Sequence, residues 1–403
     1  MTPSDDALRL RAGFVVVSSE RVLVDHEVHV AGGRVVAVVP TQVLSAAERS
    51  RAIAPGLVDA HAHLDLGALA GAVPPGPDFL DWVGRVVRGR GALDPADEAA
   101  GVRRSAQALL ETGTTSIIDI DGSGRTAAAL GEEGPRALLL REVIDGAPQG
   151  WSERSSEALA AARDALGQGR STLRAFGLSP HGTHTVGDEL LAAVAGLAAP
   201  IALAVHWAET PEEGEWLAAG TGPFANWLGP SPRISGTERL ERAGLLEGAL
   251  LVHGNAPLDG EIERAARAHA TVVHCPGSHA FFGRDRFPVE RYVRAGVPIA
   301  LGTDSWASND RLDMRREMRL ARETLGLEAR DVWRMATENG AALLPWEGLT
   351  GRLEVGDAAD LVVYELGEED DRVRRDPALA FDRLTCGEPA IVEVLIAGRP
   401  VLR

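Results

Sequence analysis

The sequence predicts an α/β protein in which a (β/α)8 barrel is joined to a small β-domain built by both ends of the chain. Strand-like segments occupy residues 13 to 40 and return near the C-terminus. Between these ends, apolar segments alternate with stretches of helical periodicity, which is the pattern of βα units and a parallel sheet. Eight such units over about 290 residues fit a barrel with insertions. A doubly wound open sheet remains the alternative.

The β-domain is predicted from alternating apolar residues at both ends of the chain. FVVVSS, EVHVAGG and RVVAVVP lie between residues 13 and 40, and Gly32 with Gly33 supplies a hairpin turn. DLVVYEL at 360–366 and AIVEVLIAGRPVLR at 390–403 have similar patterns, so we expect the two ends to pair. The predicted division is residues 1–52 with 350–403 for this domain and 53–349 for the barrel.

The barrel strands are predicted from apolar runs that end in polar or titratable residues. They cover residues 53–61, 115–120, 137–144, 173–180, 201–209, 249–255, 271–278 and 298–305. Helical stretches lie between them, for example 98–111, 154–166, 187–197, 258–269 and 311–324. No GxGxxG or GxxxxGK[ST] motif opens a helix after a strand, so nothing supports a nucleotide cofactor.

Composition and charge limit the classes of function. Apolar residues make up 45% and charged residues 25%, as in a soluble globular protein, and the sequence has no apolar run of about 18 residues that could span a membrane. The net charge of -17 argues against nucleic acid or an anionic membrane as a partner. The two cysteines imply no disulfide framework, and the first residues lack a signal pattern, so we expect a cytoplasmic enzyme.

Titratable residues gather at the ends of the predicted strands. The stretch IAPGLVDAHAHLD contains His61 and His63, whose side chains point the same way in a strand because they are two residues apart. In a barrel, the carboxyl ends of the strands meet at the active-site face. Six of the eleven histidines and one aspartate lie on or just after these strands: His61, His63, His181, His206, His253, His274 and Asp304. Because an unpaired buried imidazole costs about 1–3 kcal/mol, this repetition predicts a shared site.

Three imidazoles and one carboxylate can bind a divalent transition metal and leave a position open for water. The predicted ligands of one ion, zinc or alternatively iron, are His61, His63, His206 and Asp304. Such an ion lowers the pKa of its water toward about 7, which supplies hydroxide at neutral pH. Glu209, three residues after His206, can carry a proton from the water to a leaving nitrogen, and His253 can polarise the same water. Glu209 and His253 are therefore the predicted catalytic residues.

These motifs resemble the amidohydrolase superfamily. The match runs from the opening β-segments through AHAH, HWAE, LVHG, HCPGSH and LGTDS to GRLEVGDAADLVV, essentially the whole chain. It is similar to the single-metal branch that holds cytosine, guanine, adenosine-derivative and aminofutalosine deaminases and the triazine chlorohydrolases. The resemblance implies a distorted (β/α)8 TIM barrel with a small β-sandwich from both termini, one zinc or iron ion, and the ligands and proton-transfer residues given above.

The absence of lysine narrows this resemblance, since all 41 basic residues are arginine. Two-metal members such as dihydroorotases and ureases bridge their metals with a carbamylated lysine after the fourth strand, which this chain cannot do. His181 in SPHGTHT stands there instead. The stretch resembles the PHAPYT-like segment of nucleoside and aminofutalosine deaminases, whose histidine contacts substrate, so we predict that His181 binds substrate.

Other substrate contacts are predicted less directly. Relatives mostly read CPxSN after the seventh strand, whereas this chain reads CPGSH, so His279 replaces asparagine and the substrate identity stays open. Trp82 lies in the insertion after the first strand, where relatives place an aromatic residue over the base. The predicted substrate contacts are His181, Trp82, His279 and Ser305. Further aromatic residues beside the site are Trp207, Trp306 and Phe282.

The predicted activity is hydrolytic deamination of an aminated purine-type ring or nucleoside. By resemblance, 6-aminodeoxyfutalosine is the preferred single substrate, and methylthioadenosine, S-adenosylhomocysteine and guanine are alternatives. A second hypothesis is a different leaving group, such as chloride from a triazine or an amine from an imidazolone or N-acyl amino acid. A barrel without catalysis is the third. The expected partner is a small molecule, and a homodimer is left open.

Overall fold

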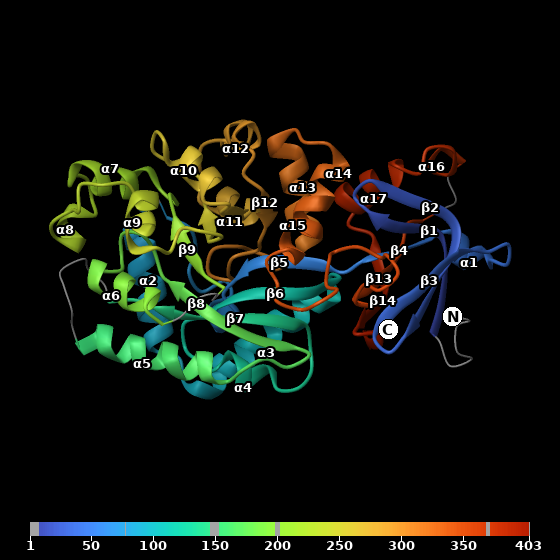
Figure 1. The fold of residues 1–403 in the computed structure, drawn as a ribbon, viewed down its shortest axis with the longest axis horizontal. Coiled ribbons are helices and arrows are strands. Elements are labelled where there is room, and N and C mark those ends of the chain that lie inside the picture. The colour runs from blue at the N-terminus through green and yellow to red at the C-terminus, as the bar shows by residue number, and fades with distance from the viewer. Residues whose placement is uncertain (1–7, 77, 146–152, 198–201, 368–370, 403) are drawn as a thin grey trace.

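The computed structural model describes residues 8–76, 78–145, 153–197, 202–367 and 371–402. Two parts lie side by side (Figure 1). One is a sheet to which both ends of the chain contribute, and the other is a larger α/β part with strands at its centre and helices around them. The predicted αβ architecture with a strand-rich terminal domain is confirmed.

Within the described residues, seven strands pair in one terminal sheet, in the order β15-β14-β13-β4-β1-β2-β3. The sheet joins the two ends of the chain because β13 runs antiparallel to β4, with Val363 opposite Ile53, and β4 runs parallel to β1. Gly32 and Gly33 form the predicted turn between β2 and β3, with φ of 58° and 76°, values that favour glycine. The strands are β1 Leu8–Ser18, β2 Arg21–Ala31, β3 Arg34–Pro40, β4 Arg51–Pro55, β13 Leu361–Glu365, β14 Ala390–Ile396 and β15 Arg399–Leu402.

The larger part, as far as it is described, contains two parallel sheets of four strands, β5-β6-β7-β8 and β9-β10-β11-β12. Single β-bridges join the edges of the two sheets: Leu178 pairs with Leu203, and Ala62 pairs with Asp304. The arrangement is therefore barrel-like. The strands are β5 Leu57–Ala62, β6 Thr114–Asp121, β7 Arg136–Val143, β8 Arg174–Pro180, β9 Ala204–Trp207, β10 Leu250–His253, β11 Thr271–His274 and β12 Ile299–Leu301.

Each predicted barrel strand has a counterpart, but the first one differs. The apolar run 53–61 is divided at Gly56, so β4 belongs to the terminal sheet and β5 begins the barrel. Side chains alternate along the strands. Ile118, Leu140 and Val252 pack together in the centre of the barrel, whereas neighbours such as Leu251 pack with the helices outside.

Helices surround the strands, and their ends follow from local sequence. Asp94 caps α3 by accepting hydrogen bonds from Ala96 N and Asp97 N, and Pro95 takes the first helical position. Asp78 caps α2 in the same way. No helix among the described residues combines the length and apolar character needed to cross a membrane. The helices are α1 Ala46–Arg49, η1 Leu64–Leu69, α2 Phe79–Gly91, α3 Pro95–Glu111, α4 Thr126–Leu130, α5 Glu153–Gly167, α6 Asp188–Ala195, α7 Pro211–Ala219, α8 Ala225–Leu228, α9 Gly236–Ala243, α10 Glu261–Arg267, α11 Pro276–Phe281, α12 Val289–Ala295, α13 Met314–Leu325, α14 Ala329–Ala336, α15 Glu338–Ala341, α16 Asp371–Arg375 and α17 Leu379–Cys386.

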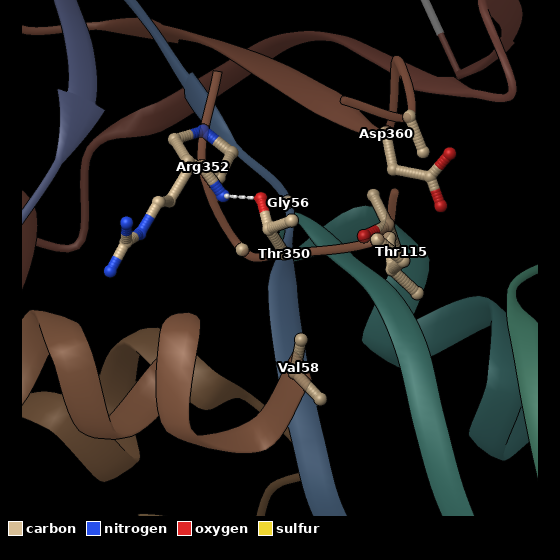
Figure 2. Close-up of a pocket in the computed structure, with 10 residues that line it drawn as sticks. Gly56, Val58, Thr115, Thr350, Arg352 and Asp360 are labelled. Carbon is tan, nitrogen blue, oxygen red and sulfur yellow. Dashed lines mark hydrogen bonds between the residues drawn. The ribbon is translucent and has the colours of Figure 1, made fainter. Parts of the chain in front are cut away.

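The terminal sheet and the barrel-like part meet at the start of β5. A Cβ at Gly56 would lie 2.0 Å from Thr115 Oγ1, so this close approach requires glycine. Beside it, the buried Asp360 accepts a hydrogen bond from Arg136 Nε at 2.5 Å. Figure 2 shows a cavity at this seam, lined among others by Val58, Thr350 and Asp360. Because the cavity lies at the amino end of β5 and β6, opposite the carboxyl ends that carry active sites in barrels, we interpret it as a packing feature.

Candidate metal centre

The predicted metal ligands lie together at the carboxyl ends of β5, β9 and β12. His63 Nε2 is 3.3 Å from His206 Nε2. Asp304 Oδ1 lies 3.7 Å from His61 Nε2 and 3.9 Å from His63 Nε2. Two overlapping groups have donor atoms that all lie within 4.8 Å of one another: His61, His63 and His206, and His61, His253 and Asp304. We name His61, His63, His206 and Asp304 the ligand centre.

The hydrogen bonds of these imidazoles fit a bound cation. Both ring nitrogens of His61 are buried and have no hydrogen-bond partner among the described residues, which costs about 1–3 kcal/mol unless a ligand satisfies them. His206 Nδ1 bonds to the His181 carbonyl oxygen at 2.6 Å, so its Nε2 is left facing His63 Nε2. Burial, helped by neighbouring histidines, lowers the pKa of His206 to about 3 and that of His63 well below its usual range. Both rings are therefore neutral, which is the form that binds a metal.

Backbone contacts between β5 and the residues after β12 fix the centre. Asp59 accepts hydrogen bonds from His61 N at 3.2 Å, from Thr303 N at 3.0 Å and from Thr303 Oγ1 at 2.5 Å. Asp304 N donates to the His61 carbonyl oxygen at 2.9 Å. Strand alternation explains only part of this geometry, because β5 has a register shift between Asp59 and Ala62 and ends before His63. Such bulges re-aim side chains beside active sites.

The carboxylate of Asp304 is held from the other side by Ser278, whose Oγ donates to Asp304 Oδ2 at 2.7 Å. Burial alone would raise the pKa of Asp304, but the rings of His61, His253 and His63 around it lower that pKa below its usual range. Asp304 therefore stays ionised. Its φ of 63° lies in the left-handed region, as does the φ of 77° at His253, so both residues carry backbone strain at the site.

Glu209 and His253, the predicted catalytic pair, lie beside this centre. Glu209 Oε2 is 3.8 Å from His253 Nε2. Glu209 follows β9 in a turn that Glu213 holds by accepting hydrogen bonds from Ala208 N and Glu209 N, both at 3.0 Å. Burial raises the pKa of Glu209 to about 7, although Arg284, whose Nη2 is 3.1 Å from Glu209 Oε1, opposes this rise. Burial lowers the pKa of His253 well below its usual range.

Two of the predicted substrate contacts, His181 and His279, lie near the ligand centre or near Glu209. The half-buried ring of His181 lies 4.9 Å from that of His206, and burial lowers the pKa of His181 to about 3. His279 Nδ1 lies 3.1 Å from Asn255 Oδ1, and Asn255 Nδ2 in turn donates to the Glu209 carbonyl oxygen at 3.1 Å. These two histidines stay predicted contacts beside the site.

Ser305, Trp207 and Trp306 each have contacts within the protein. Ser305 is buried, and its Oγ lies 2.8 Å from Ser308 Oγ in the turn after β12, so a substrate contact by Ser305 also stays a prediction. Trp207 does not line the site: its ring packs in the outer core with the helices, and its Nε1 donates to Glu261 Oε1 at 3.0 Å. The reason is strand alternation, because Trp207 follows His206 directly and faces the opposite way. Trp306 packs with Leu64 and Leu312.

Four residues around the centre were not assigned roles from the sequence. Asp59 and Ser278 orient ligands, Asn255 contacts the Glu209 backbone, and Arg284 pairs with the Glu209 side chain. Ser278 lies inside the CPGSH motif, Asp59 inside the stretch IAPGLVDAHAHLD, and Asn255 at the end of the predicted strand 249–255, so three of the four lie in segments that the sequence singled out. Arg284 lies in a segment without periodicity, five residues after His279, and only the three-dimensional structure brings it to Glu209.

The fold and the donor set together define a barrel-like hydrolase scaffold with a candidate centre for one metal ion. The profile described as Amidohydrolase family matches residues 52–401, and the chain belongs to this family. It is therefore an enzyme, a hydrolase of carbon–nitrogen bonds, and the resemblance found in the motifs is confirmed.

Relatives and a solved structure agree with this placement. A protein of Halobacterium salinarum named 5-methylthioadenosine/S-adenosylhomocysteine deaminase is 33% identical over 387 residues, which cover 89% of this chain and 84% of the relative. An aminodeoxyfutalosine deaminase of Deinococcus radiodurans is 33% identical over 321 residues, which cover 73% and 74% of the two chains. The crystal structure of an adenosine deaminase from Xanthomonas campestris with bound zinc is 30% identical, has a TM-score of 0.81, and aligns over 98% of this chain and 92% of that one.

Proposed function

We propose that the chain is a metal-dependent aminohydrolase that removes the amino group from a purine-type ring or nucleoside, with 6-aminodeoxyfutalosine as the best single substrate. The observation that carries the proposal is the place of Glu209, a carboxyl with a pKa near neutrality beside the ligand centre. Family membership and relatives that are named deaminases of adenosine derivatives support the same reaction.

The ligand centre would hold one divalent ion through His61, His63, His206 and Asp304. We infer zinc, because three imidazoles with one carboxylate suit it and the Xanthomonas campestris structure carries it, and iron is the alternative. When bound, such an ion lowers the pKa of a coordinated water toward about 7.

The chain's own residues would move the protons and hold the ring. With a pKa of about 7, Glu209 can accept a proton and return it to the leaving nitrogen near neutral pH. His253, neutral and 3.8 Å from Glu209 Oε2, would orient that carboxyl or accept a hydrogen bond from the attacking water. His181, neutral and beside His206, would contact the substrate ring, together with His279 and Trp82.

A second candidate is deamination of methylthioadenosine or S-adenosylhomocysteine. The relatives from Halobacterium salinarum and Deinococcus radiodurans are equally identical to this chain but carry names of the two different activities. Sequence identity alone therefore does not determine which group the substrate carries on its sugar.

We also infer a closed, distorted (β/α)8 barrel and a β-sandwich made by the terminal sheet. The edge bridges from Ala62 to Asp304 and from Leu178 to Leu203 support closure. Contact between the β2–β3 turn and the residues just before β13 supports the sandwich, because Ala359 N donates to the Gly33 carbonyl oxygen at 2.9 Å. Residues 1–52 with 350–403 would form the small domain and residues 53–349 the barrel. A cytoplasmic location and a homodimer are further proposals.

Ammonia release by purified, zinc-loaded protein tests the proposed function. The panel contains adenine, guanine and cytosine, their nucleosides, 6-aminodeoxyfutalosine, methylthioadenosine and S-adenosylhomocysteine, with Glu209→Gln measured alongside. Fast release from one adenosine derivative that is lost in the variant supports the proposal. No release from any compound, with one zinc bound per chain, would reject it in favour of another leaving group such as chloride, whose departure needs no proton from Glu209.

A further inference from the structure

Aromatic side chains and one arginine from distant parts of the chain meet beside Glu209. Phe79 and Trp82 lie on α2, and Phe282 and Arg284 lie just after α11. The rings of Phe79 and Trp82 stack with centroids 5.7 Å apart, and the Phe282 ring is 5.5 Å and 4.9 Å from them, edge to face. The Arg284 guanidinium carbon lies 5.1 Å from the Phe79 ring centroid and 4.8 Å from that of Phe282. We name these four residues the rim cluster.

Phe79, Trp82 and Phe282 are each half-buried, so part of each residue is exposed to solvent. Trp82 is anchored by its Nε1, which donates to the Ala307 carbonyl oxygen at 3.2 Å in the turn after Asp304. The cluster therefore rests on the loop that carries a predicted metal ligand. A group bound against these rings lies beside the reacting centre.

Arg284 is the charged member of the rim cluster, and its ion pair with Glu209 uses one of the two terminal nitrogens of the guanidinium. Its side chain is 13% exposed, and among the described residues only Glu209 accepts from it, with Arg284 Nη2 3.1 Å from Glu209 Oε1. A guanidinium has five N–H donors and favours planar carboxylates, and it stacks well on aromatic rings. The Arg284 guanidinium can therefore bind an aromatic carboxylate. In this structure, its partner is the carboxylate of Glu209.

We propose that the rim cluster is the subsite for an aromatic group with a carboxylate on the substrate, and that this carboxylate takes the Arg284 guanidinium from Glu209. The rings of Phe79, Trp82 and Phe282 receive the aromatic part. No bond is made or broken in the exchange, since one carboxylate replaces another beside the same cation. The inference rests on the proposed function, and it adds the chemical nature of a second part of the substrate, an aromatic group that carries a carboxylate. It separates a substrate with an acidic aromatic group from neutral methylthioadenosine.

Binding of small probes tests the subsite without any turnover. Benzoate and its neutral counterpart benzamide are titrated into the zinc-loaded protein and followed by NMR. Arg284→Gln is compared with Arg286→Gln, a matched control, because Arg286 is exposed and pairs with Glu290. We expect benzoate to bind at least about tenfold more tightly than benzamide, and this preference to disappear only in Arg284→Gln, since a hydrogen bond to a charged group contributes that much. Equal binding of the two probes, or an equal loss in both variants, would overturn the inference.

Kinetics provide the second test. Arg284→Gln removes the partner of Glu209 for every substrate, so the informative quantity is the ratio of kcat/KM for 6-aminodeoxyfutalosine, which has an aromatic carboxylate, to that for methylthioadenosine. We expect this ratio to fall at least about tenfold, mainly through KM. An unchanged ratio in an active variant would reject the subsite while leaving the deaminase intact. Benzoate binding through Arg284 without deamination of any compound would reject the proposed function while leaving the subsite intact.

Discussion

The ligand centre and the rim cluster meet at Glu209, yet they are built by different interactions. The centre stands on strand ends that backbone hydrogen bonds tie together, as between Asp304 N and the His61 carbonyl oxygen at 2.9 Å. The rim cluster joins a helix and a loop about 200 residues apart through side-chain stacking and one ion pair. The comparison indicates that the barrel fixes the chemistry, whereas side chains that are easily exchanged set the selectivity.

The ligand centre and the rim cluster also differ in the charges of their side chains. In the centre, burial keeps the imidazoles of His63 and His206 neutral, and the rings of His61, His253 and His63 lower the pKa of Asp304, which stays ionised. In the rim, Arg284 is a permanent cation that pairs with a carboxyl whose pKa is about 7. The centre is therefore suited to a metal ion, and the rim to an anion.

The largest effect is expected in the ligand centre. Asp304→Asn keeps the size of the side chain but removes the charged donor, so bound zinc should fall well below one per chain. Activity should fall by roughly 10³-fold or more, beyond the ~10–100-fold typical of residues that only support a ligand. Metal analysis together with kcat/KM measures this. Full zinc content with normal activity would show that Asp304 is not a ligand.

Glu209→Gln should separate metal binding from proton transfer. We expect kcat to fall by about 10²- to 10⁴-fold, as for loss of a general acid–base, while zinc stays near one per chain. The measurements are kcat and metal content on the same preparation. If the variant lost zinc together with activity, Glu209 would be a metal ligand. Metal binding and proton transfer would then not be assigned to different residues.

Ser278→Ala tests a residue that supports the centre without belonging to it. Removing the 2.7 Å hydrogen bond to Asp304 Oδ2 frees the carboxylate to rotate. Zinc affinity should fall about 10–100-fold, and kcat of the fully loaded enzyme should change less. Competition with a chelator measures the affinity. An affinity equal to that of the unchanged protein would show that backbone contacts alone position Asp304.

The smallest effect is a shift in pH dependence. Arg284 favours the ionised form of Glu209, whose pKa is about 7, so its removal should raise that pKa by roughly one unit. If ionised Glu209 starts the reaction, activity is lost as the pH falls through this pKa. The acid limb of kcat/KM for methylthioadenosine should therefore move to higher pH in Arg284→Gln. A limb that stays in place or moves to lower pH contradicts this role for the ion pair.

Much of the barrel and its centre could be predicted from the sequence because both follow from short-range patterns. Apolar runs gave the strands, and the histidines at their ends, with Asp304, were recognisable together. Pro55 and Gly56 interrupt the apolar run 53–61, but the division of this run between two sheets was not predicted, because the close contact of Gly56 with Thr115 exists only in the folded chain. Trp207 was expected beside the site, but it packs in the core, because adjacent residues in a strand point in opposite directions and His206 faces the centre.

The rim cluster could be predicted only in part. Trp82 and Phe282 were found as aromatic residues beside motifs, but their contact depends on how α2 and the segment after α11 fold over the barrel. Arg284 carried no signal, because arginine is the chain's only basic side chain apart from histidine and many arginines pair on the surface. Contacts between residues 79–82 and 282–284 are set by tertiary packing, which local patterns do not contain.

Anomalous diffraction at the zinc absorption edge, from crystals of the zinc-loaded protein, would show whether the ligand centre holds the metal ion. We expect one peak within bonding distance, about 2.0–2.3 Å, of the imidazole nitrogens of His61, His63 and His206 and of an Asp304 oxygen. No peak at these residues, or a single peak bound elsewhere in the chain, would contradict this expectation.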